Sequence, residues 1–108
     1  MDLIENLLKF GDLEWDKPHV GVEQKFYSDG KTRIRLLRFY DDFVEEHWCT
    51  KGHIGYVLDG EMTIDFNAEL KNYQKGDGLW IVKGEQSKHK VLIEKGKHVE
   101  LVLFESEE

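Results

Sequence analysis

Short runs that alternate apolar and polar residues follow one another from residue 20 to residue 104, and turn sequences separate them. In the run Thr32–Tyr40, for example, Arg33 and Arg35 alternate with Ile34 and Leu36, as on a half-buried strand. The turns contain glycine, which supplies the backbone conformations that tight turns need. They are Ser28-Asp29-Gly30, Asp59-Gly60, Gly76-Asp77-Gly78 and Lys95-Gly96-Lys97. A series of such strands predicts an all-β sandwich or a small barrel.

Four other segments carry more specific expectations. Residues 2–10 place apolar side chains at helical spacing and Gly11 follows as a cap, so a short N-terminal helix is predicted. Asp59-Gly60 is a strong hairpin signal between two strands. Residues 67–72 are expected to form a loop, and the acidic tail Glu105–Glu108 is expected to fray.

Composition limits the class of protein. With 108 residues and 40% hydrophobic residues, a single domain over residues 1–108 can build its own core, with the barrel at about residues 20–104. A net charge of −7 and a pI near 5.2 argue against binding to nucleic acid or to an anionic membrane. The sequence shows no signal-peptide pattern and no stretch long enough to span a membrane. One cysteine cannot form an internal disulfide, so the cytoplasm is expected.

Four side chains have the chemistry to bind a metal ion, namely His47, Cys49, His53 and His89. In an extended segment, residues two apart point the same way, so His47 and Cys49 can face one ion. His53 follows Gly52, where the chain can bend and return a third ligand, and His89 would come from a strand paired nearby. Imidazole and thiolate are good donors for divalent transition metals.

Simpler interpretations exist for several of these residues. His19 and His98 are expected to be ordinary surface or hydrogen-bonded histidines. Cys49 has a second interpretation as a small buried apolar residue. The arginines at positions 33, 35 and 38 either bind an anionic substrate or form a solvated strand face, and the solvated face is favoured. Glu46 is a candidate for the outer hydrogen-bond partner of a ligand histidine.

The stretch from His47 to Glu61 resembles the first sequence motif of the cupins. That motif has two histidines one residue apart, then a glutamate and a closing glycine. His47 matches the first histidine and Gly60 the closing glycine. Cys49 occupies the position of the second histidine, and His53 that of the glutamate, as in the subset of small cupins with all-histidine sites.

A second cupin motif combines a glycine, an extended run, a turn and a histidine. Gly78 begins such a run here, and His89 follows it at the usual interval. Lys83-Gly84-Glu85 replaces the usual proline turn. The resemblance covers about residues 20–104.

The resemblance implies a double-stranded β-helix, the cupin jelly-roll barrel, with one metal ion inside it near one end. The ion would be zinc, iron, nickel, copper or manganese. Small cupins also pair through strand edges, so a homodimer is expected.

Three functions remain open at this point. The first is a metal-dependent enzyme acting on a small polar or anionic molecule, with sugar-derived molecules among the candidates. The second is a non-catalytic module that binds or senses a metal or a small ligand; a closed site with four protein ligands would favour it. The third is a metal-free barrel. No catalytic residue is identifiable from the sequence, because no general base stands out.

Overall fold

A computed structural model describes residues 6–107 of the chain, and its regular structure is almost entirely β. The expected all-β class is therefore confirmed. Two short 3₁₀ turns, η1 (Phe10–Asp12) and η2 (Glu85–Ser87), accompany the strands. The strands are β1 (Asp16–His19), β2 (Val22–Ser28), β3 (Thr32–Tyr40), β4 (His53–Asp65), β5 (Leu70–Gln74), β6 (Gly78–Ile81), β7 (Lys90–Leu92) and β8 (His98–Ser106).

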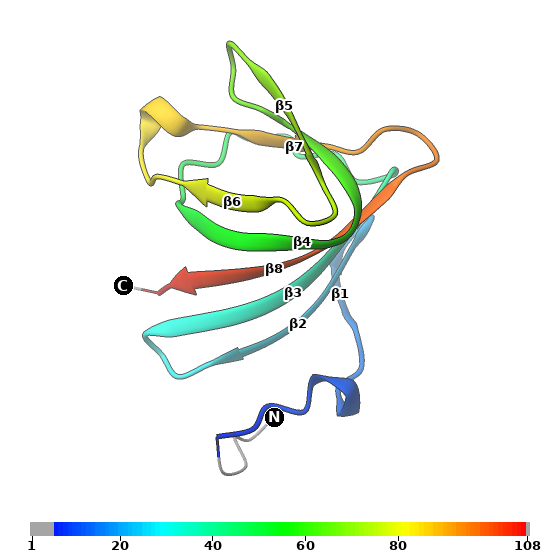
Figure 1. Ribbon diagram of the computed structural model, residues 1–108, viewed down its shortest axis with the longest axis vertical. Helices are drawn as coiled ribbons and strands as arrows, with labels where there is room; N and C mark the ends of the chain where they lie inside the picture. The colour runs from blue at the N-terminus through cyan, green and yellow to red at the C-terminus, as the bar shows by residue number, and fades with distance from the viewer. Residues whose placement is uncertain (1–5, 108) are drawn as a thin grey trace.

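The strands form one curled antiparallel sheet in the order β1-β2-β3-β8-β4-β5, with β6 and β7 also paired to β4. Figure 1 shows β2, β3 and β8 side by side, and β4 curving away from them toward β5 and β7. The curl encloses an interior, as the resemblance to a jelly-roll barrel implies. No helix in the described part of the chain is long and apolar enough to cross a membrane.

Alternation along the strands fills this interior. In β8, Val99, Leu101 and Leu103 are buried, while the residues between them are more exposed. Leu101 pairs with Leu37 of β3, so apolar side chains meet across the sheet. The buried apolar core consists of Val22, Leu37, Val57, Met62, Ile64, Leu79, Ile81, Val99, Leu101 and Leu103.

The hairpin predicted at Asp59-Gly60 is wrong, because β4 continues through these two residues as one strand. The pairing of β4 with β8 shifts register between Val57 and Asp59, as at a β-bulge. Before the bulge the odd-numbered Val57 faces the core, and after it the even-numbered Met62 and Ile64 do. Gly60 has φ +73°, so its conformational freedom serves this corner in the strand and not a chain reversal.

The predicted N-terminal helix is not confirmed. Residues 2–5 lie outside the described part of the chain, and residues 6–9 are not helical. Gly11 lies within the 3₁₀ turn Phe10–Asp12 and does not cap a helix. Tertiary contacts hold the segment instead, because Lys25 Nζ of β2 donates to the carbonyl oxygen of Phe10 over 2.9 Å.

Two smaller expectations are also corrected. The loop predicted at residues 67–72 is shorter, because β5 begins at Leu70 and pairs with β4. The tail predicted to fray from Glu105 instead continues β8 as far as Ser106, and Glu105 is buried.

Candidate metal site

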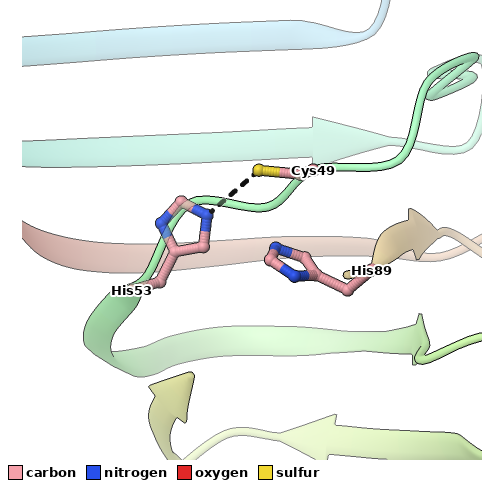
Figure 2. A group of neighbouring side chains, drawn as sticks. All are labelled: Cys49, His53 and His89. Atoms are coloured by element: carbon pink, nitrogen blue, oxygen red, sulfur yellow. Dashed lines mark hydrogen bonds between the residues drawn. The ribbon is translucent and has the colours of Figure 1, made fainter. Parts of the chain in front are cut away.

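Two of the candidate ligands face each other across backbone hydrogen bonds. The amide of Cys49 donates to the carbonyl of His89 over 2.9 Å, and the amide of His89 donates back over 3.0 Å. Directly paired residues of antiparallel segments project their side chains to the same face. His53 begins β4 and lies on the same side of that strand as buried Val57. The structure thus brings Cys49, His53 and His89 together (Figure 2).

One ligand atom from each of these three residues lies within 4.8 Å of the others. The Sγ atom of Cys49 is 3.7 Å from Nε2 of His53. The rings of His53 and His89 meet edge to face, with centroids 5.2 Å apart. His89 is buried, and the other two side chains are half-buried.

The other ring nitrogen of each histidine already faces an acceptor. Nδ1 of His89 lies 2.9 Å from the carbonyl oxygen of Ser87. Nδ1 of His53 lies 3.3 Å from Oε2 of Glu105, close enough for an ion pair although not aligned as a hydrogen bond. Metal-binding histidines usually have this outer support, which leaves Nε2 as the nitrogen that can bind an ion.

The donor set fits a metal ion. Zinc binds thiolate sulfur at about 2.3 Å and imidazole nitrogen at about 2.0–2.1 Å, and a tetrahedral angle puts two such donors roughly 3.6 Å apart. The observed separation of Cys49 Sγ and His53 Nε2 is 3.7 Å. One sulfur and two nitrogens suit zinc and the other borderline transition metals.

His47 does not join this group. It lies at a bend, and its side chain is exposed. Residues two apart point to the same side only where the backbone is extended. The bend at His47 interrupts the extended backbone before Cys49, so the two side chains need not point the same way. His47 as a ligand therefore stays a prediction. Glu46 is also exposed, and Glu105 stands behind the ligand histidine in its place.

Electrostatics favour an ion pair between the sulfur and the imidazoles. Hydrogen bonding from His53, and then from His89, lowers the pKa of Cys49 to about 5 against the effect of burial. Burial alone would lower the pKa of His53, but Cys49 and Glu105 outweigh it and raise this pKa to about 9. A thiolate next to imidazole is the form of cysteine that binds metals.

Glu105 also binds two arginines of β3. Its Oε1 accepts from Nε and Nη2 of Arg33, at 3.2 and 3.0 Å, and its Oε2 accepts from Nη2 of Arg35 at 2.8 Å. Burial raises the pKa of Glu105, but His53 and the two arginines outweigh burial and lower the pKa to about 2. The carboxylate is therefore ionised behind His53.

Sequence reasoning missed this cluster. The sequence favours a solvated strand face for Arg33 and Arg35, whereas in the structure both side chains line the cavity together with Leu37. The signal was present in β8, because Glu105 continues the inward spacing of Leu101 and Leu103. A charged residue at an inward position of an apolar strand is a marker of function or of pairing.

The three candidate ligands line a cavity of about 510 Å³ inside the curled sheet. Arg33, Arg35 and Glu105 line it as well, and most of the remaining wall is apolar. Glu45 also lines this cavity, and burial raises the pKa of its carboxyl. Its Oε1 accepts a hydrogen bond from the amide of Val91 at 2.7 Å.

Comparison with known proteins supports the fold. No protein-family model and no curated protein matches the sequence. Among solved structures, the polyketide cyclase RemF from Streptomyces resistomycificus superposes with a TM-score of 0.80 at 13% identity, covering 97% of this chain and 81% of that one. KdgF from Halomonas sp. superposes with a TM-score of 0.70 at 18% identity, covering 91% of this chain and 89% of that one. An RmlC-like cupin from Shewanella frigidimarina superposes with a TM-score of 0.75 at 15% identity, covering 100% of this chain and 96% of that one.

These likenesses establish the fold, which is that of a small cupin domain. At identities this low they carry the fold and not the activity. Within that fold, this chain has the group of Cys49, His53 and His89 in the wall of its cavity.

Proposed function

We propose that this protein is a metal-dependent enzyme that holds one divalent transition metal through Cys49, His53 and His89. The observation that carries the proposal is the convergence of three ligand atoms within 4.8 Å of one another on the wall of a cavity. Structural metal sites are usually closed by four protein ligands, whereas catalytic sites keep a position open. Three converging donors beside an open cavity favour the catalytic arrangement.

The bound ion would supply Lewis acidity toward a substrate oxygen. The chain supplies the rest of the site. Glu105 and the carbonyl of Ser87 fix the orientation of His53 and His89, and aliphatic side chains form much of the remaining cavity wall. Glu45 faces the same cavity with a raised pKa, so it is the candidate for proton transfer.

The proposed substrate is a small polar or anionic molecule. A cavity of about 510 Å³ suits a small molecule, and its arginines suit a negative group. Enzymatic chemistry is compatible with this fold, since one structural neighbour is a polyketide cyclase. Sugar-derived molecules remain candidates, and zinc, iron, nickel, copper and manganese remain candidates for the ion.

The first test is the metal content of the purified protein. We expect about one transition-metal ion per chain, lost in His53→Ala and in Cys49→Ala, and retained in the matched control His98→Ala. His98 is exposed and contacts Asp59, outside the proposed ligand group. Absence of metal in the wild-type protein, even after reconstitution, would contradict the proposal.

The metal content of His47→Ala distinguishes the proposed enzyme from the alternative, a non-catalytic binding module. Retention of metal in this variant would leave three protein ligands and an open position, as a catalytic site requires. Loss of metal would mean that His47 turns inward and closes a four-ligand site, which favours a structural or sensing role.

A further inference from the structure

All three arginines of the chain lie on β3, and two of them face the cavity. Arg33 and Arg35 share the inward side of the strand with Leu37, whereas Arg38 lies on the opposite side, over the ring of Trp15. The chain as a whole carries a net charge of −7, so two arginines that face its cavity are not expected from its overall composition. Guanidinium groups are costly to bury unless they have partners.

Glu105 partners these arginines only in part. Arg33 and Arg35 carry two positive charges, and one carboxylate, Glu105, pairs with both of them. Glu107 forms a longer ion pair with Nε of Arg33 at 3.8 Å, and both of these side chains are partly exposed. Lys51 and the carboxyl group of Glu45 also line the cavity.

Arg35 has unused donors. Its Nη2 binds Glu105, and its Nη1 reaches only a long contact of 3.4 Å with Gln24. Its Nε is buried and has no hydrogen-bond partner within residues 6–107. A guanidinium offers five N–H donors, and a buried one left unpaired costs free energy that a bound acceptor would recover.

The guanidinium groups and the walls of the cavity suit a carboxylate that carries a carbon chain. Arginine can bind a carboxylate through two parallel hydrogen bonds. Beside the arginines, the wall is aliphatic, with Leu37 on the same strand and Leu101 and Leu103 on the paired strand β8. Such a wall packs against a carbon chain.

A neighbouring hollow adjoins this position. It has a volume of about 560 Å³ and shares Arg33, Lys51, His53 and Glu105 with the cavity. Lys83 and Glu107 line it too, so both basic and acidic side chains face this hollow.

We propose that Arg33 and Arg35 bind the carboxylate of a small organic acid whose carbon chain lies along the aliphatic wall of the cavity. The inference rests on the proposed function, because it assigns a substrate class to the same cavity. It narrows the candidates from polar or anionic molecules in general to aliphatic carboxylates.

The test uses butyrate, its neutral counterpart butyramide, and inorganic phosphate. Because the chain has only three arginines, their Nε–H resonances can be followed one by one in ¹H–¹⁵N spectra. We expect butyrate to shift the signals of Arg33 and Arg35 saturably and to leave that of Arg38 in place. Butyramide should shift none. Unmoved signals, or tighter binding of phosphate than of butyrate, would overturn the inference.

Variants supply a second measurement. Arg35→Gln should weaken butyrate binding by about tenfold or more, as expected for the loss of a charge-assisted hydrogen bond. Arg38→Gln is the matched control, with the same substitution on the outer side of the same strand. Equal weakening in both variants would count against the site.

Zinc-loaded and metal-free protein separate this inference from the metal site. Butyrate that binds only in the zinc-loaded form, and equally well in Arg35→Gln, is held by the ion, which overturns the arginine site and leaves the metal site standing. Butyrate binding at Arg35 in a protein that retains no metal supports the arginine site while the metal site fails.

Discussion

Glu105 contacts three basic side chains at once, Arg33, Arg35 and His53. Removing one member of such a buried ion cluster is costly, because the others keep their charge without a partner. The same carboxylate supports the imidazole from the side away from Cys49. One residue therefore links the anion-binding arginines to the candidate metal ligands.

Glu105→Gln should weaken metal binding about 10- to 100-fold, the usual effect of losing an outer partner of a ligand histidine. It should also lower the free energy of unfolding of the metal-free protein by roughly 1–3 kcal/mol, because both arginines lose their carboxylate. Chelator competition measures the first effect and urea titration the second. Glu107→Gln, a partly exposed neighbour, is the control and should change neither. Unchanged affinity in Glu105→Gln would refute the supporting role.

The metal-free protein should contain a thiolate at neutral pH. Its ultraviolet absorbance should appear with a midpoint near pH 5, because hydrogen bonds from His53 and His89 lower the pKa of Cys49 to about 5 from its usual 9.0. A lowered pKa favours folding above the usual value, and this contribution is lost as the pH falls through about 5. His53→Gln should raise the midpoint, and His98→Gln should not. A wild-type midpoint near that of an ordinary thiol would contradict the arrangement.

At the scale of elements, β4 decides how the sheet curls. Its first part pairs with β6 and β8, and its second part pairs with β5 and β7. The bulge between these parts changes which residues face inward, so that both halves contribute to one core. The corner also lets His53 and Met62, at opposite ends of the strand, line the same cavity.

Gly60→Ala should be strongly destabilising, by roughly 2–4 kcal/mol in urea unfolding, because it combines strain at positive φ with a steric clash. A Cβ there would lie 2.0 Å from the carbonyl oxygen of His98 on β8. Gly30→Ala is the matched control, since Gly30 has φ +91° but nothing within 4 Å of its Cβ position. It should cost only about 1 kcal/mol. Equal losses in the two variants would show that the close contact has no effect.

The sequence predicts most of the strands but not how they are joined. Thr32–Tyr40 was predicted with its observed bounds, because alternation and flanking turns are local signals. Asp59-Gly60 was misread because a bulge and a hairpin both use glycine at positive φ, and only the distant partner β8 distinguishes them. Burial of Glu105 likewise depends on arginines remote in sequence.

The site shows the same division. Cys49, His53 and His89 were identified by residue type and spacing, and the structure brings them together. His47 was included by the same-side rule, which a bend not visible in the sequence interrupts. The alternating pattern of Thr32–Tyr40 predicts that Arg33 and Arg35 lie on the same face of the strand. It does not predict whether that face points into the barrel or toward solvent.

At the scale of the molecule, the outer face of the sheet carries an aligned apolar row. Trp80 of β6 pairs with Ile54 of β4, which pairs with Phe104 of β8. These side chains are 77%, 44% and 47% exposed, respectively. Exposed apolar surface of this kind is typical of contact with another protein. The homodimer expected from the sequence stays a prediction, and this row is where we would test it.

Light scattering after size-exclusion chromatography should give twice the chain mass of 12.7 kDa for the wild-type protein. Trp80→Glu should shift the protein toward the monomer, because a carboxylate is costly to bury between two apolar faces. Val20→Glu is the control, because Val20 is also an exposed apolar residue but lies in the turn before β2. This variant should have the same mass as the wild-type protein. A wild-type monomer across the accessible concentration range would dismiss the dimer.

The position of β8 has a consequence for the order of folding. This strand inserts between β3 and β4, whose residues lie far back along the chain, so the sheet depends on contacts of long sequence separation. Such contacts form slowly, because large loops must close before any pairing is gained. Glu105 reaches His53 only after β8 has inserted. The geometry of the candidate ligands is therefore expected to be completed in a late step of folding, and any opening that releases β8 also removes the support that Glu105 gives to His53.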